Sequence, residues 1–435
     1  MPKGKKKGKY EHKRTEQAYS SDEDAGIDMT IDNCSEISGQ SDLKSNHEDA
    51  ENDVQEKLEE KVLELIESLN ARASAARAQA LCSLQGALQR RYLAGLLAAH
   101  RATLADHVAR TLRRGRDAER RAAANLAPLL ALQIGEEGTE EFMKEVRPAL
   151  FAACTDKSAS IETRTDCCSS LAVLCYLLEE DFTEIIEVLR MYETIFSGSY
   201  LKGDSSVKVC GAAVAEGPLH AAALDGWALV LALAEPAHAA ALLRAGPPAP
   251  HRLLQLLEAC SLEVRMAAGG ALAVAHERCV EGGAGGAGGA APWAGSEAAL
   301  QARLEQLARD PHKYRAKRDR KLQRATFRDI LKYFEEGAVP ALRVAVGGEA
   351  VEMRSWAGRG AYAALAGALG GGLAALAPHC APLRHALELP AAPPPRAPPS
   401  RLDKLQRHLQ NNAACKARTL ARNKSRDKRS AALAL

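Results

Sequence analysis

Aromatic side chains are scarce in this sequence. Phe, Tyr and Trp together make up 4% of its 435 residues, although 46% of the residues are hydrophobic. The hydrophobic fraction excludes a chain that is disordered throughout. The shortage of aromatic residues argues against recognition of nucleic-acid bases by stacking, and it favours a core filled by Leu and Ala.

Motifs of catalysis and of metal binding are missing as well. None of the eleven cysteines forms a C-x-x-C pair, and no H-E-x-x-H, G-x-S-x-G or P-loop sequence occurs. We therefore expect no enzyme, no metal, no cofactor and no small-molecule substrate. Most cysteines lie in apolar helical patterns, which predicts buried, reduced thiols in an intracellular protein: Cys82, Cys154, Cys167, Cys168, Cys175 and Cys260.

Membrane signals are weak. The first residues are basic and have no apolar core, so they do not form a secretory signal. Residues 360–383 lack charge and are long enough to cross a bilayer. They consist mostly of Ala and Gly, however, with Gly370, Gly371 and Gly372 in the middle, and their leucines fall on one helical stripe. We expect a packed helix there and no contact with a membrane.

Charge is segregated along the chain, although the formal net charge is only +3. Residues 20–60 carry fourteen acids and two lysines, whereas residues 310–332 carry nine bases and three acids. Residues 401–429 carry ten bases and two acids. Blocks of like charge are often interaction tails, and basic stripes can follow a phosphate backbone, but such runs can also be merely solvated.

Composition divides the chain into four parts. Residues 1–53 read as a disordered charged tail, in which Ser20 and Ser21 each precede an acid by three positions and are candidate phosphorylation sites. Residues 54–389 follow a helical period and include a Gly/Ala-rich insertion at 281–292. Residues 390–400 form a Pro-rich linker, and residues 401–435 a basic C-terminal helical domain. No segment alternates convincingly enough to predict a strand.

An internal repeat appears within residues 54–389. A base follows a short polar or acidic start in five places, with a small residue three positions later, at Arg77, Arg120, Arg164, Arg265 and Arg354. The period is near 45 residues, and a degraded unit around His220 fills one long gap. Such a period predicts an all-α helical solenoid of the armadillo/HEAT class, in which the arginine caps carbonyl groups or pairs with an acid of the next unit.

Two basic helices are candidate binding sites for a nucleic acid or an acidic partner. After a helix start at Asp310, one arc of about 120° carries Lys313, Lys317, Arg320, Lys321, Arg324, Arg328 and Lys332. The second helix carries Lys416, Arg418, Arg422, Lys424, Arg426, Lys428 and Arg429, and we expect it to become helical when it binds. A nuclear-localisation signal is a competing interpretation of the second segment.

At these two basic stretches the sequence resembles the interferon-related developmental regulator family. The similarity is sharpest at residues 313–330 and 416–429, and it is clear also at residues 224–229, which include Trp227. The resemblance implies an armadillo-like N-terminal domain, a short C-terminal domain and no enzymatic activity. It further implies a transcriptional co-regulator that acts through histone-deacetylase co-repressor complexes. Alternatively, it implies a ribosome-binding factor whose C-terminal helix enters the mRNA channel. The two roles together would place the protein in the nucleus and the cytoplasm.

Overall fold

The computed structural model describes residues 45–179, 181–208, 211–246, 248–281, 295–309, 317–390 and Thr419. The chain divides into a unit of residues 1–55 and a unit of residues 56–435, and helix α1 runs from the first into the second. The elements up to α10 are α1 Ser45–Ser68, α2 Ser74–Leu88, α3 Ala94–Leu97, η1 Ala98–His100, α4 Arg101–Arg114, α5 Asp117–Ile134, α6 Glu136–Thr155, α7 Ile161–Leu178, α8 Phe182–Phe196, η2 Ser197–Ser199, α9 Gly211–Ala215 and α10 Gly217–Leu231. They are followed by α11 Pro236–Ala245, α12 Pro250–Leu256, α13 Leu262–Glu281, α14 Glu297–Arg309, α15 Lys317–Glu336, β1 Leu342–Val346, β2 Glu349–Met353, α16 Trp356–Leu369, α17 Gly372–Leu376 and α18 Ala381–Ala386.

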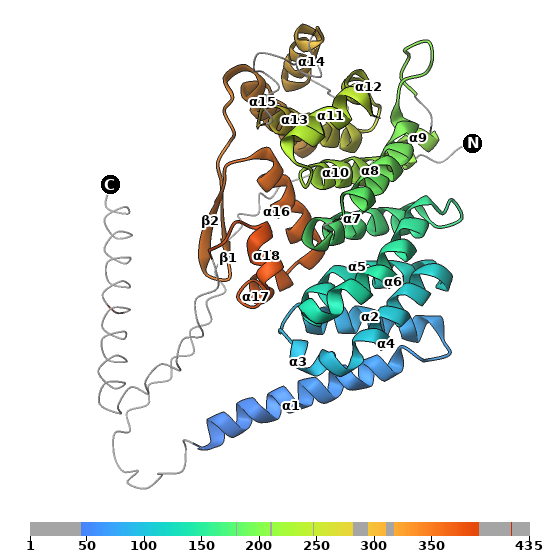
Figure 1. Ribbon diagram of the computed structural model, residues 1–435, viewed down its shortest axis with the longest axis vertical. Helices are drawn as coiled ribbons and strands as arrows, with labels where there is room; N and C mark the ends of the chain where they lie inside the picture. The colour runs from blue at the N-terminus through green and yellow to red at the C-terminus, as the bar shows by residue number, and fades with distance from the viewer. Residues whose placement is uncertain are drawn as a thin grey trace, which may run out of the picture. The chain divides into compact units, whose positions relative to one another are not determined.

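Packed helix pairs stack along the second unit, as the succession of colours in Figure 1 shows. Helix α2 packs against α5, α5 against α7, α7 against α10 and α10 against α13. We call these five the inner helices. A second layer is made by α4, α6, α8 and α11, which pack against the inner helices from the other side. The prediction of a mostly helical fold is confirmed, and the armadillo/HEAT class stays a prediction.

Small residues and leucines fill the core, as the low aromatic content predicts. Leu84, Leu104, Leu130 and Leu171 are each completely buried. Gly226 permits close packing of α10 against α8 and α7, because a Cβ there would lie 2.9 Å from Tyr192 Cζ and 3.2 Å from the Cβ of Ala172. A larger residue at this position would force α10 away from both helices.

A cation occupies the fourth position in four of the five inner helices, at Arg77, Arg120, Arg164 and Arg265. The Arg77 guanidinium donates to the Ala71 carbonyl at 2.7 Å and to Glu119 of the next unit at 2.7 Å. Arg164 donates to the carbonyl of Cys154, and Arg265 to that of Ala259. Each of these carbonyl groups belongs to the last turn of the preceding helix or to the residues just after it. The arginine therefore joins the two helices of a pair. The expected capping role is confirmed.

The remaining two inner helices use the same position differently. Arg120 pairs with the Asp156 carboxylate at 2.9 Å instead of with a carbonyl. In α10 the position belongs to His220, whose Nδ1 lies 2.7 Å from the Ser199 hydroxyl. The degraded unit predicted around His220 is therefore a helix in register with the others.

The fifth predicted repeat was wrong in register, and the absence of strands was wrong as well. Residues 351–353 belong to β2, so Arg354 follows a strand instead of beginning a helix. Strands β1 and β2 form an antiparallel hairpin joined by Gly347 and Gly348, whose φ angles are 56° and 89°. These angles suit a two-residue turn of type I′, and a Gly-Gly pair between alternating residues was the missed signal. Helix α16 begins after the hairpin, and its fourth residue, Arg359, donates to the Pro340 carbonyl.

The segment after the hairpin folds back over the inner helices, and Figure 1 shows α16 to α18 beside α5 and α7. The Glu277 carboxylate accepts the backbone N–H of Trp356 at 2.9 Å. Further along, the Cys380 thiol donates to the Leu132 carbonyl at 3.3 Å. The segment 360–383 is thus packed on protein, and in the described part of the chain no helix is long and apolar enough to cross a membrane.

The described residues can be compared with two of the boundaries expected from composition. Helix α1 begins at Ser45, inside the range 1–53 that composition predicted to be disordered. At the other end, the described structure runs to Pro390, where the predicted Pro-rich linker begins. Residues 282–294, which include most of the predicted Gly/Ala insertion, lie outside the described residues.

Candidate nucleic-acid interface

Helix α15 is amphipathic, and its apolar face is fixed to α13 and α14. Phe327 and Ile330 are completely buried. They reach Gly269 of α13, where a Cβ would lie 2.7 Å from Ile330 Cδ1 and 3.0 Å from Phe327 Cε1. Gly269 therefore permits the close seating of α15, which gives the opposite face a fixed orientation.

An aromatic cluster secures the C-terminal end of α15. The ring of His276 on α13 lies 4.7 Å from that of Phe334 and 5.6 Å from that of Tyr333, centroid to centroid. Tyr333 in turn lies 5.8 Å from Trp356 of α16. Burial lowers the pKa of His276, so its imidazole is neutral at physiological pH. The cluster explains this histidine as a packing residue.

The other face of α15 is cationic, as the sequence predicts. Lys317, Lys321, Arg328 and Lys332 are exposed, and they fall within about 60° of arc. Arg320 and Arg324 lie at the rim of this face and are half-buried. The Arg324 Nε donates to the Arg320 carbonyl at 3.3 Å, so its stem lies along the helix. We call these six residues the cationic face.

Acids limit the cationic face at its C-terminal end. Glu336 lies 3.8 Å from Lys332, and Glu335 accepts a hydrogen bond from Gln301 at 2.9 Å. An exposed pair of this kind contributes little stability. The excess of positive charge is therefore concentrated in the first three turns of α15, where a phosphate backbone or a row of carboxylates would lie.

Leu322 adds an exposed apolar side chain beside the cationic face, with 57% of its surface accessible. It was not predicted as a binding residue, because a single leucine in a basic run gives no periodic signal. Arg318 is exposed next to it. An aliphatic side chain among bases can pack against the sugar of a nucleotide or against an apolar residue of an acidic protein.

Several predicted residues lie outside the described part of the chain. Of the first basic helix this applies to Lys313 and to the start proposed at Asp310, because α15 is described from Lys317. The basic residues from Lys416 to Arg429 and the candidate phosphorylation sites Ser20 and Ser21 are also outside it.

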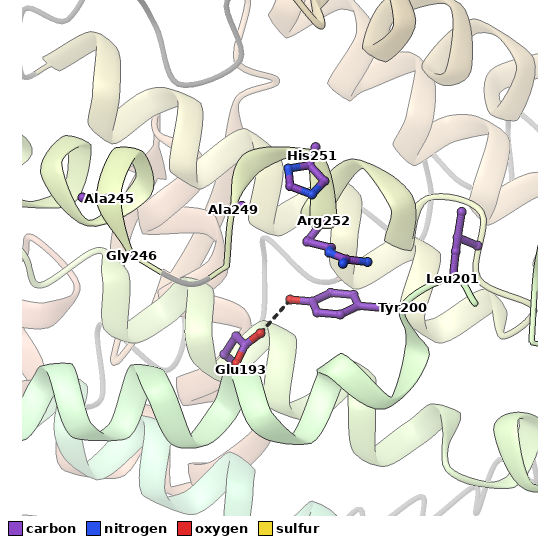
Figure 2. A pocket seen from close by; sticks show the side chains of 8 residues that line it. All are labelled: Glu193, Tyr200, Leu201, Ala245, Gly246, Ala249, His251 and Arg252. Carbon is purple, nitrogen blue, oxygen red and sulfur yellow. Dashed lines mark hydrogen bonds between the residues drawn. The ribbon is translucent and has the colours of Figure 1, made fainter. Parts of the chain in front are cut away.

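A hollow of about 690 Å³ opens between α8 and α12 and was not anticipated from the sequence. Figure 2 shows the Arg252 guanidinium above the ring of Tyr200, 5.5 Å from the ring centre. The Tyr200 hydroxyl donates to the Glu193 carboxylate at 3.1 Å. Exposed His251 completes the polar wall. The hollow presents the Arg252 guanidinium and the Glu193 carboxylate, so it suits a polar ligand better than an apolar one.

The buried thiols do not form a reactive or metal-binding site. Cys154, Cys167, Cys168 and Cys175 are buried, as predicted, whereas Cys82 is exposed and Cys260 half-buried. Burial raises the pKa of Cys167 and of Cys175 to about 12, so both stay protonated. Within the described residues no group of three or more His, Cys, Asp or Glu is placed to hold a metal ion.

Comparison with known proteins places two conserved regions on this chain. The model described as interferon-related developmental regulator matches residues 33–335, and the interferon-related protein conserved region matches residues 383–430. Interferon-related developmental regulator 1 of Sus scrofa is 34% identical over 433 residues, which cover 94% of this chain and 90% of that protein. The protein of the same name from Homo sapiens is 34% identical over 427 residues, covering 94% and 89%. Interferon-related developmental regulator 2 of Mus musculus is 33% identical over 389 residues, covering 87% and 84%.

Proposed function

Because the chain belongs to the interferon-related developmental regulator family, we propose that it is a non-enzymatic regulator of gene expression that binds RNA, in particular ribosomal RNA. One observation carries the proposal: the cationic face of α15 is held rigidly by Phe327 and Ile330 on α13. A fixed row of bases can follow a phosphate backbone without first being ordered.

The second basic segment supports the same proposal from the sequence. Residues 416–429 carry seven bases and one acid, and they lie within the matched conserved region 383–430. Residues 416–429 carry no aromatic residue, so we expect this segment to recognise backbone charge and shape, with little preference among bases. On a ribosome, the C-terminal segment would line rRNA or the mRNA channel.

The test compares two variants of equal charge. In one, the exposed α15 bases Lys317, Lys321, Arg328 and Lys332 are changed to Ala; in the control, exposed Lys144, Lys157, Arg190 and Arg244 are changed to Ala. We expect the first to lower the slope of log K against log [salt] for a single-stranded RNA by about 2 to 3, since each phosphate contact contributes about 0.7. Equal slopes for the two variants would refute the role of α15.

Ribosome binding is tested separately by sedimentation through sucrose gradients. The full chain is expected to co-sediment with ribosomes at low salt and to dissociate at high salt. A chain that lacks residues 401–435 should lose most of this co-sedimentation. If the truncated chain sediments as the full chain does, residues 416–429 do not contact the ribosome.

A second candidate function is that of a transcriptional co-regulator that binds protein partners, including histone-deacetylase co-repressor complexes, and acts in both nucleus and cytoplasm. Stacked helix pairs offer long surfaces for peptides, and the Arg252 hollow is one such surface. A pull-down from nuclear extract that recovers no deacetylase component, together with exclusion of the protein from nuclei, would argue against this function.

A further inference from the structure

Four of the inner helices carry a stripe of residues along the same face. The stripe is accessible to solvent near the start of each helix and buried nearer its end. In α5, α7, α10 and α13 the ninth residue is Asn125, Ser169, Asp225 and Gly270, and each of them is at least partly accessible. A Cβ on Gly270 would meet nothing within 4 Å. Four residues later, on the same face, stand Leu129, Val173, Leu229 and Val274, all of them buried. One stripe therefore changes from open to covered at the same level in four helices.

The covering is supplied by residues 356–390 of the same chain. The start of this cover is held by Glu277, which accepts hydrogen bonds from the N–H groups of Trp356 and Ala357. Further along, the Cys380 thiol donates to the Leu132 carbonyl. A Cβ on Gly372 would lie 2.9 Å from Leu129 Cδ2, which places the cover directly on the stripe of α5. Among the described residues the N-terminal halves of these four stripes have no such cover.

The uncovered halves are acidic. Glu162, Asp225 and Glu263 are exposed on the stripes of α7, α10 and α13, and half-buried Asp166 stands beside Glu162. The one base on these half-stripes, Arg121, lies 2.8 Å from the Asp166 carboxylate, so that pair is neutral. We call Glu162, Asp166, Asp225 and Glu263 the acidic row. Among the described residues Glu162, Asp225 and Glu263 form no ion pair, although Glu263 accepts a hydrogen bond from the Ser261 hydroxyl at 2.6 Å.

Asp225 has a second property that points to a cationic occupant. Its side chain is exposed, and among the described residues no ion pair or hydrogen bond of its carboxylate is found. The surrounding helices nevertheless withdraw enough hydration to raise its pKa to about 7. A cation beside this carboxylate would restore the stability of the charged form, and small Ser169 and Gly270 leave room for it on both sides.

The chain itself leads a basic segment to this surface. Helix α18 packs against α7, and the Pro390 carbonyl accepts a hydrogen bond from Arg384 Nε at 2.9 Å, so the described chain ends beside the covered half of the α7 stripe. From Tyr176 at that end to Glu162 is about 21 Å along the helix. The 25 residues between Pro390 and Lys416 can span about 80 Å when extended, which is more than enough.

We propose that residues 416–429 dock intramolecularly on the acidic row when no polyanion is bound. Inner helices lie about 9 Å apart, so an extended chain passes about three residues per helix, and fourteen residues are enough to cross all four stripes. Tethering makes this contact effective although each exposed ion pair is weak. It follows that RNA and the acidic row compete for this segment. This consequence rests on the proposed function.

Zero-length crosslinking of the full chain tests the docking without RNA. A carbodiimide joins lysine amines to carboxylates in contact, so we expect links from Lys416, Lys424 and Lys428 to Glu162, Asp225 and Glu263, and their loss at high salt. Exposed Glu140, Glu187 and Glu258 are the matched controls. Links to the controls at equal yield, or links only between two molecules in a mixture of isotopically light and heavy chains, would overturn the proposal.

A binding experiment tests the competition. The variant Glu162→Gln/Asp225→Asn/Glu263→Gln should bind a 20-nucleotide oligouridine at least fivefold more tightly than Glu140→Gln/Glu187→Gln/Glu258→Gln, which has the same net charge. Equal affinities of the two variants would contradict the competition. If no variant binds RNA while the intramolecular crosslinks still form, the proposed function fails and the docking stands.

Discussion

Glu277 of α13 accepts a hydrogen bond from the backbone N–H of Trp356, 79 residues further along the chain, at 2.9 Å. Its second oxygen accepts the N–H of Ala357 at 2.8 Å. One carboxylate thus satisfies two of the N–H groups that the start of α16 leaves unpaired. Because α16 lies across the inner helices, this contact fixes where the cover of the inner stripe begins.

Replacing Glu277 by Ala should destabilise the protein by about 1 to 2 kcal/mol, the usual effect of losing a helix cap. The loss should be local as well as global, since α16 would open more often than α13. Hydrogen exchange measures both, and the amides of α16 should exchange faster than those of α7. Glu258→Ala removes an exposed acid and is the control; unchanged exchange in α16 would show that Glu277 is not the anchor.

Arg384 joins the hairpin to the last helix. Its Nη1 and Nη2 lie 2.9 and 3.0 Å from the two Glu349 oxygens, and its side chain is buried. Arg384→Met should lose about 2 kcal/mol at neutral pH, as expected for hydrogen bonds to a charged group. Exposed Arg343→Met, which removes a looser pair with Glu352, is the control and should have little effect.

The same pair predicts a pH dependence. The hydrogen bond from Arg384 holds the pKa of Glu349 below its ordinary value of 4.5. A lowered carboxylate pKa adds stability that is complete above the ordinary value and is lost as the pH falls through the lower native value. The difference between wild type and Arg384→Met should therefore be constant above about pH 5 and shrink below pH 4.5. Denaturant unfolding at several pH values measures it; a difference that grows towards acid would contradict the assignment.

Two adjacent glycines of α13 should respond oppositely to the same change. Gly270→Ala meets open space and should stabilise the helix by about 0.5 to 1 kcal/mol. Gly269→Ala would place its methyl group 2.7 Å from Ile330 Cδ1, so α15 must shift and the protein should lose stability. Thermal unfolding of the two variants gives the sign. If Gly269→Ala is as stable as Gly270→Ala, α15 is not seated as described.

The pKa of Asp156 is held at about 2, first by hydrogen bonds from Ser158 and then by that from Arg120. Ser158→Ala removes the hydroxyl hydrogen bond, which is the largest single contribution, but keeps the one from the backbone N–H. Arg120→Met removes a weaker hydrogen bond together with a charge. Both changes should raise this pKa, and it should stay below the ordinary value of 3.8 in each. Titration followed by the NMR signal of the Asp156 carboxyl carbon distinguishes the two. A larger effect of Arg120→Met would mean that the ion pair dominates.

The repeat could be predicted from the sequence where its periodic signal was strong, and it could not where the matching segment was short. Arg77, Arg120, Arg164 and Arg265 were recognised because each begins a helix with the same spacing. Arg354 was assigned by the same spacing, yet it follows a strand, because a local pattern of four residues cannot separate a helix start from a hairpin edge. The cationic face needed only the helical period and was predicted residue by residue from Lys317 to Arg328.

The sequence by itself determined the helical class, the Ala/Leu core, the arginine at the start of the inner helices and the positive face of α15, because each depends on residues close together in the chain. The tertiary structure alone decided what covers the inner stripe, since Glu277 and Trp356 meet only after 79 residues have folded back. It also decided that Asp225 and Glu263 lie on the same face of two packed helices, because the packing of α10 against α13 is encoded by no local period.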